Sequence, residues 1–272
     1  MATPSRANVL GIGVHALHLE STVDLMESAI VRSTKGYICV TNVHAVIEAR
    51  KDPRYRRVLN NSFLTVPDGR PTVWIGHSQG FKTMDQVSGP ELMLKFCEMS
   101  CGKGYSHFFY GGQPGVVEQL KDSLTRRFPG LNVVGTYCPP FRPLNREEES
   151  EIRGLLAKLK PDVTWIGLGA PKQELFMAAH LDNLDTTLMV GVGAAFDVHT
   201  GRITDPPLWV KRAGFAWLHR LGQEPRRLWK RYLTTNSRFL CEITLQLLKL
   251  RTYDLEAPSG NKQDRAKDPA RT

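Results

Sequence analysis

The sequence lacks several features that would place it in common protein classes. Its 272 residues contain no run of about 20 apolar residues, so we expect no segment that spans a bilayer. Residues 1–6 lead into a short strand pattern (9–14) without the apolar core of a secretion signal, which indicates a cytoplasmic protein. The five cysteines are an odd number and lack metal spacing. We therefore expect neither a disulfide framework nor a cysteine metal site.

What the sequence does contain is an alternation of apolar strand patterns with helical patterns. A hydrophobic content of 41% is enough to bury a substantial core. Strands are expected at 37–40, 63–66, 105–110, 131–136, 163–166 and 188–192, and a helix at 116–128. We predict an α/β protein with a smaller N-terminal α/β lobe (1–103), a Rossmann-like parallel-sheet lobe (104–201), a basic helical appendage (202–257) and a disordered tail (258–272).

Glycine-rich or polar segments follow four of these strands. They are Gly111-Gly112, residues 137–142, the stretch from Gly167 to Glu174, and the stretch from Gly193 to Asp197. Ligands bind at the carboxyl edge of open parallel sheets, and N–H groups at the start of the following helix favour anions. Each segment alone also suits an ordinary tight turn. The convergence of all four on one edge favours a ligand site.

Polar residues also end two strands of the N-terminal part. Thr41 and Asn42 follow one strand, and Asp68-Gly69 follows the next. Asp-Gly is common in turns, which is one interpretation. The other is that the carboxylate faces a cleft and acts as a general base on a nearby hydroxyl. The residues by themselves leave both interpretations open.

Taken together and in order, these motifs resemble the WecG/TagA/CpsF glycosyltransferase family over about residues 8–240. The resemblance rests on Thr41-Asn42, Pro67-Asp68-Gly69, Gly111-Gly112, Pro139-Pro140-Phe141-Arg142, the segments 167–174 and 191–197, and Glu224-Pro225-Arg226-Arg227. It implies an inverting, metal-independent enzyme without a cofactor. Such an enzyme moves a hexose or N-acetylhexosamine (glucose, N-acetylmannosamine or its uronic acid) from a UDP-sugar to a polyprenyl-diphosphate-linked saccharide during exopolysaccharide or cell-wall synthesis.

The resemblance also implies roles for single residues. Asp68 matches the catalytic base, Thr41 and Asn42 match the polar pair beside it, and Gln173 matches a substrate contact. The nucleotide-sugar is expected at Gly111, Gly112, Tyr137, Gly169, Lys172, Gly193 and Asp197. These candidates include no Asp-x-Asp pair of the kind that holds Mg²⁺ on a diphosphate, so no metal site is predicted.

One position departs from the family pattern. The family commonly has an arginine where this chain has Gln86, and that arginine is thought to stabilise the departing diphosphate. We expect Lys82, Arg70 or a C-terminal arginine to take its place, or the enzyme to be slower or to use a different substrate.

The net charge of +9 is concentrated near the C-terminus. Residues 202–251 carry eleven Lys or Arg against three acids, a net +8, interleaved with Trp, Phe and Leu. This composition predicts a helical element that binds the inner face of the cytoplasmic membrane peripherally. Arg220, Arg226, Arg227 and Arg231 are expected to meet the membrane or a diphosphate. Alternatively, the apolar residues pack on the protein's own core and the charges are solvated.

Within this segment we predict a helix that begins at Pro225 and is interrupted at Asn236. No nucleic-acid-binding fold accompanies the basic residues, so nucleic acid is not an expected partner. The oligomeric state is open, and a homo-oligomer is possible.

Two rival functions follow from the same residues. A dinucleotide-dependent oxidoreductase or epimerase would suit the glycine-rich turn at Gly167, but the full Gly-x-Gly-x-x-Gly spacing is broken because Lys172 occupies the last position. A basic adaptor without catalytic activity, docking on membranes or nucleic acid, would suit the charge.

Overall fold

The computed structural model describes residues 4–255, which divide into two compact units. Within this range, the first unit comprises residues 4–18, 40–87 and 205–255, and the second comprises 19–39 and 88–204. The N-terminal range that we predicted as one lobe, 1–103, thus contributes to both units, and most of the basic appendage belongs to the first. The predicted tail, 258–272, lies outside the described residues.

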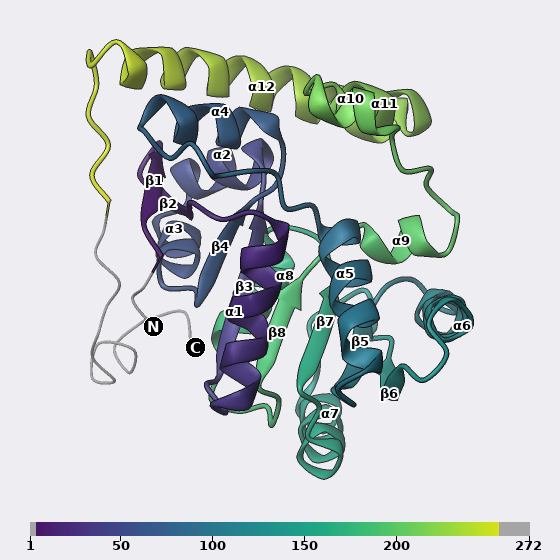
Figure 1. The fold of residues 1–272 in the computed structure, drawn as a ribbon. Helices are drawn as coiled ribbons and strands as arrows, with labels where there is room; N and C mark the ends of the chain where they lie inside the picture. The colour runs from purple at the N-terminus through teal and green to yellow at the C-terminus, as the bar shows by residue number, and fades with distance from the viewer. Residues whose placement is uncertain (1–3, 256–272) are drawn as a thin grey trace. The chain divides into compact units, whose positions relative to one another are not determined.

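The second unit is built on parallel strands. They are β3 (Gly36–Thr41), β8 (Leu188–Gly191), β7 (Val163–Gly167), β5 (Ser106–Gly111) and β6 (Asn132–Tyr137), in that spatial order (Figure 1). The end of β3 belongs to the first unit, where β4 (Leu64–Pro67) completes the six-stranded order β4-β3-β8-β7-β5-β6. Long apolar runs suit such strands because both faces of a parallel sheet are covered. The predicted α/β class is confirmed.

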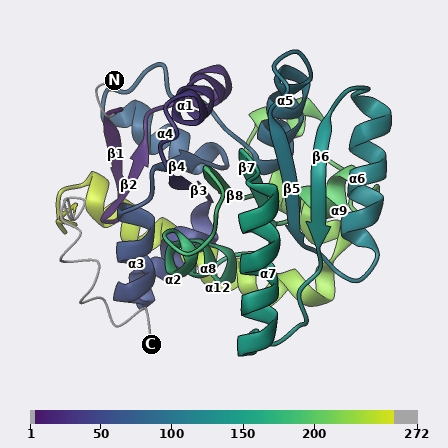
Figure 2. The same ribbon diagram turned by 90° about the horizontal axis from the view of Figure 1, so that it is seen from below.

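Helices cover both faces of the second unit's sheet (Figure 2). One face carries α1 (Leu19–Val31), α5 (Gly89–Cys101), α6 (Val116–Arg127) and α9 (Ala195–His199); the other carries α7 (Arg146–Leu159) and α8 (Lys172–His180). The helices lie on both faces because the crossover connections are right-handed. The chain moves in one direction from β5 to β6 and in the opposite direction from β6 past β5 to β7, so the two connecting helices pack on opposite faces of the sheet. Phe108, Phe109 and Trp165 are fully buried between the layers.

The first unit begins with a hairpin instead of the single predicted strand at 9–14. Strands β1 (Arg6–Val9) and β2 (Ile12–His15) pair antiparallel. The turn between them uses Leu10 and Gly11 at positive φ, a conformation that the apolar pattern alone does not reveal. Asn60 holds the hairpin, because its side chain accepts from the Gly13 N–H at 2.9 Å and donates to the Gly11 carbonyl at 3.0 Å.

Three short helices surround this hairpin, namely α2 (Val43–Lys51), α3 (Pro53–Asn60) and α4 (Arg70–Ser78). The basic C-terminal segment adds α10 (Leu208–Arg212), α11 (Ala216–Gln223) and α12 (Pro225–Leu247). Helix α12 runs along α2, and Arg50 of α2 forms an ion pair with Glu242 of α12 at 3.1 Å. No helix within residues 4–255 is long and apolar enough to cross a membrane.

Helix α12 begins at Pro225, as predicted, but the predicted interruption at Asn236 is wrong. The helix continues through Asn236 to Leu247. Asn in a helix interior costs less than about 1 kcal/mol relative to Ala. Burial of Leu228, Phe239 and Ile243 on one side of α12 outweighs that cost, since each buried apolar side chain contributes about 1.5–3 kcal/mol.

Candidate active site

The turn after β3 brings a polar pair to the start of α2. Thr41 is the last residue of β3 and is buried, and Asn42 is the N-cap of α2. The Asn42 side-chain oxygen accepts from the Ala45 N–H at 3.1 Å, which satisfies one of the N–H groups left open at a helix start. This cap fixes the amide, so its Nδ2 points in a defined direction.

That direction is toward Asp68. Asn42 Nδ2 donates to Asp68 Oδ2 at 3.3 Å, and the Asp68 backbone N–H donates to the Thr41 carbonyl at 2.9 Å. Asp68 is half-buried at the end of β4, and Gly69 after it has φ +101°, a conformation that side chains disfavour. The structure therefore brings Thr41, Asn42 and Asp68 together, with a positioned carboxylate that can accept a proton.

Arg70 lies in the same turn, at the first position of α4. Its guanidinium Nη1 donates to Asp85 Oδ1 at 2.6 Å, and the same oxygen accepts from the Gln86 backbone N–H at 2.8 Å. Lys82 is held elsewhere, because its Nζ donates to the His77 carbonyl near the other end of α4. Of these two candidates for the missing charge, only Arg70 shares a turn with Asp68.

Arginines of the C-terminal helices gather at the start of α12. Partial burial opposes ionisation of Glu224, but the hydrogen bond and charge of Arg227, with the charges of Arg220 and Arg231, outweigh it and lower the pKa of Glu224. Three of the four predicted arginines thus lie around one carboxylate, and Arg226 is exposed. This cluster keeps an excess of positive charge.

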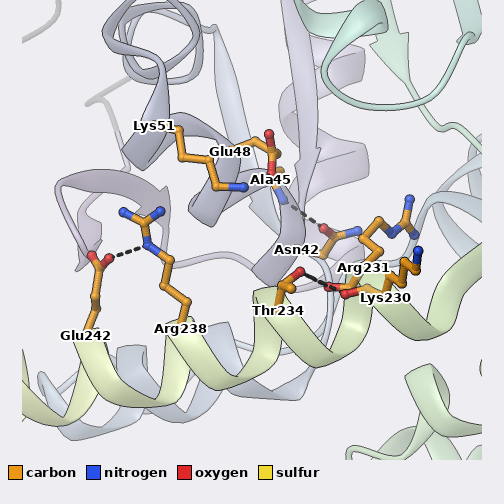
Figure 3. Close-up of polar contacts among 9 residues, drawn as sticks. All are labelled: Asn42, Ala45, Glu48, Lys51, Lys230, Arg231, Thr234, Arg238 and Glu242. Carbon is orange, nitrogen blue, oxygen red and sulfur yellow. Dashed lines mark hydrogen bonds and ion pairs between the residues drawn. The ribbon is translucent and has the colours of Figure 1, made fainter.

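Arg231 also lies close to the start of α2, where Figure 3 shows it near Asn42. Burial, together with the charge of Arg231, lowers the pKa of His44 to about 4. Within the described part of the chain, His44 Nδ1 and the Nε atoms of Arg220 and Arg231 are buried without a hydrogen-bond partner. The sequence motifs assign no role to His44. The available signal was its place two residues after Asn42, in the first turn of α2.

The second unit holds the remaining predicted residues, at the carboxyl edge of its sheet. Gly111 at the end of β5 lies opposite Gly167 of β7, and a Cβ on Gly111 would come within 2.7 Å of the Gly167 backbone. The Gly112 N–H donates to the Gly167 carbonyl at 3.1 Å. Glycine at position 111 is therefore required by the close approach of two strand ends, whereas Gly112 is favoured by its positive φ of +78°.

Gln173 joins the loops that follow β7 and β8. Its side-chain oxygen accepts from the Gly169 N–H at 3.1 Å and from the Gly193 N–H at 3.0 Å, and its nitrogen donates to Glu174 at 2.8 Å. The residue is only 3% exposed. Two N–H groups that we predicted for the nucleotide are thus bonded to Gln173 in this structure, and its contact with substrate stays a prediction.

The other predicted nucleotide residues lie at the same edge. Tyr137 ends β6 half-buried, and its ring stacks on that of Tyr110 with centroids 5.6 Å apart. Lys172 is exposed at the start of α8. Asp197 lies in the first turn of α9, where its backbone carbonyl accepts from the Arg202 N–H at 2.9 Å. Their binding roles stay predictions.

Comparison with known proteins extends over nearly the whole described chain. A family model described as "Glycosyl transferase WecG/TagA/CpsF family" matches residues 7–253. A Bacillus spizizenii protein named N-acetylglucosaminyldiphosphoundecaprenol N-acetyl-beta-D-mannosaminyltransferase is 29% identical over 217 residues, 79% of this chain and 82% of that protein. Proteins with the same name from Bacillus subtilis (25% identical, 80% of this chain and 83% of theirs) and Staphylococcus aureus (24%, with 84% and 91% covered) are also similar.

Proposed function

Because the chain belongs to the WecG/TagA/CpsF family of glycosyl transferases, we propose that it transfers a hexose or N-acetylhexosamine from a UDP-sugar to a polyprenyl-diphosphate-linked saccharide, with inversion. N-acetylmannosamine is the first sugar to test, since three relatives are named for its transfer to N-acetylglucosaminyl-diphosphoundecaprenol. Their names also specify a β product, which is what inversion of an α-linked donor gives.

The observation that carries the proposal is the Asp68 carboxylate, held by the Asn42 amide at the ends of β3 and β4. In the proposed reaction the acceptor hydroxyl oxygen attacks the anomeric carbon on the face opposite UDP. The bond from that carbon to the β-phosphate oxygen breaks, and UDP leaves with the electron pair. Asp68 takes the proton of the attacking hydroxyl as general base.

The departing UDP gains negative charge, which fixed cations and N–H donors stabilise. Arg220, Arg227 and Arg231 form a cationic cluster in the same unit as Asp68, and the Nε atoms of Arg220 and Arg231 are buried without a hydrogen-bond partner within residues 4–255. We propose that these guanidinium groups bind the diphosphate of a substrate and that no divalent metal is required. Loss of activity in EDTA that Mn²⁺ restores would contradict this part.

The exposed residues of α10–α12 support a peripheral site on the membrane surface. Trp229, Leu233 and Leu240 recur at four- and seven-residue spacing, so they share one side of α12, and they are 49%, 63% and 63% exposed. Leu228, Phe239 and Ile243 instead face the unit's interior. Packing on the core thus accounts for only part of the apolar residues, and the outward set suits an interfacial helix next to basic residues.

Vesicle binding tests this localisation. We expect Trp229→Ala with Leu240→Ala to reduce co-sedimentation with phosphatidylglycerol vesicles several-fold, and added salt to weaken binding of the unaltered protein. Val31→Ala, which removes an exposed apolar side chain from the second unit, is the matched control. Equal vesicle binding by all three proteins would contradict a membrane role for α12.

The decisive experiment is a transfer assay with the purified chain. UDP-N-acetylmannosamine and UDP-glucose are each incubated with an N-acetylglucosaminyl-diphospholipid, and the product linkage is determined by NMR. We expect a β-linked disaccharide lipid from one donor. The absence of product from either of these donors and from the uronic acid donor would overturn the proposed function.

A further inference from the structure

Arg70 begins the helix that follows the Asp68 turn, and the reaction proposed above gives its guanidinium no role. Arg70 follows Asp68 by two residues and begins α4. The segment that holds its side chain is itself fixed to the end of β4, because the Val87 N–H donates to the Pro67 carbonyl at 2.8 Å. Asp85, which accepts from Arg70, also donates its N–H to the Leu17 carbonyl at 3.0 Å.

The surroundings of Arg70 remove most of its side chain from water. It is 20% exposed, whereas its partner Asp85 is 57% exposed. A turn of the C-terminal segment covers it, since a Cβ on Gly214 would lie 3.5 Å from Arg70 Cβ and 2.8 Å from the Trp74 ring. The Nε atom is buried and has no hydrogen-bond partner within the described residues. Arg70 is thus ordered, partly desolvated and able to donate further hydrogen bonds.

Such a guanidinium suits a diphosphate. Arginine presents five N–H donors in a planar arrangement, so one edge can hold Asp85 while another meets phosphate oxygens. Lys82 is bonded to the His77 carbonyl near the opposite end of α4, about 10 Å along the helix axis from Arg70. Arg220, Arg227 and Arg231, which we propose above as ligands of a substrate diphosphate, are grouped around Glu224 in the C-terminal helices.

We propose that Arg70 donates hydrogen bonds to the diphosphate of the UDP-sugar and stabilises the charge that UDP acquires as it leaves. This inference rests on the proposed function. It adds a catalytic residue next to the base, and it assigns Asp85 the role of holding the guanidinium in place.

The first test distinguishes a contact between Arg70 and the diphosphate from a purely structural role of Arg70. Arg70→Gln and the control Lys82→Gln are compared by calorimetry with UDP and with uridine, and by transfer turnover. We expect Arg70→Gln to weaken UDP binding at least tenfold while uridine binding is unchanged, and to lower turnover by about a hundredfold. Lys82→Gln should match the unaltered protein in all three measurements.

Asp85→Asn distinguishes the proposal from a purely structural ion pair. If Arg70 only braces the turn, Asp85→Asn and Arg70→Gln should damage folding and turnover equally. If Arg70 binds the diphosphate, Asp85→Asn keeps the positive charge and only weakens the positioning of the guanidinium, so UDP affinity should fall much less than in Arg70→Gln. If Arg70→Gln fails to fold, Arg70→Lys is measured in its place. Because lysine keeps the positive charge, Arg70→Lys should retain more UDP affinity than the uncharged variants.

The outcomes keep the two proposals apart. Transfer by the unaltered protein, with UDP affinity and turnover preserved in Arg70→Gln, would overturn the role of Arg70 and leave the proposed function intact. Absence of transfer, with a UDP-specific loss of affinity in Arg70→Gln, would overturn the proposed function and leave the diphosphate contact standing.

Discussion

The turn that carries Asp68 and the loops joined by Gln173 both follow buried strands, yet they use polar side chains differently. Asp68 is half-buried, and the Asn42 amide donates to its carboxylate at 3.3 Å. Gln173 is 3% exposed, and its amide bonds two backbone N–H groups and a carboxylate. Position at a strand end therefore does not by itself distinguish a reactive group from a structural one. The buried amide of Gln173 fits a structural role, and the half-buried carboxylate of Asp68 fits the role of base that we propose.

The largest effect is expected at Asp68. Asp68→Asn removes the proton acceptor while keeping nearly the same shape, so we expect turnover to fall by about a hundredfold or more with UDP binding nearly intact. A radiolabelled-sugar transfer assay measures the turnover. Near-normal transfer by this variant would remove the basis for calling Asp68 the base.

Gln173 should show the opposite pattern, with stability affected first. Gln173→Ala leaves the Gly169 and Gly193 N–H groups without their acceptor, which we expect to lower the free energy of unfolding by about 2–3 kcal/mol in urea denaturation. Gln119→Ala on the exposed side of α6 is the control and should change stability little. Unchanged stability in Gln173→Ala together with lost activity would show that Gln173 contacts substrate and does not mainly stabilise the two loops.

Asn42 combines both kinds of role, and two substitutions separate them. Asn42→Ala removes the cap of α2 and the bond to Asp68, so stability should fall by about 1 kcal/mol and turnover should fall as well. Asn42→Ser keeps a capping oxygen but has no amide donor. We expect Asn42→Ser to recover the stability in thermal melts without recovering turnover, and recovery of both would show that Asn42 acts only through the helix.

Much of the fold was predictable because the signals are local. Apolar runs placed β3 through β8 to within about two residues, and Pro225 marked the start of α12. The hairpin turn at Leu10 and the continuous helix through Asn236 were not predictable, since the first depends on positive φ and the second on burial of distant residues along the helix. The Thr41, Asn42 and Asp68 contact was predicted by resemblance, whereas the place of His44 beside Arg231 was not.

By itself, the sequence determined the α/β class, the family, and the position of Asp68 directly after a buried strand, because hydrophobic periodicity and short motifs act over a few residues. Only the tertiary structure decided which side of α12 faces inward, which loops Gln173 joins, and that Arg70 pairs with Asp85 while Lys82 bonds the His77 carbonyl. Such contacts join residues far apart in the sequence, as for Gln246 of α12 and Asn8, which are 238 positions apart. Their partners are selected by packing of the whole unit, which no local pattern specifies.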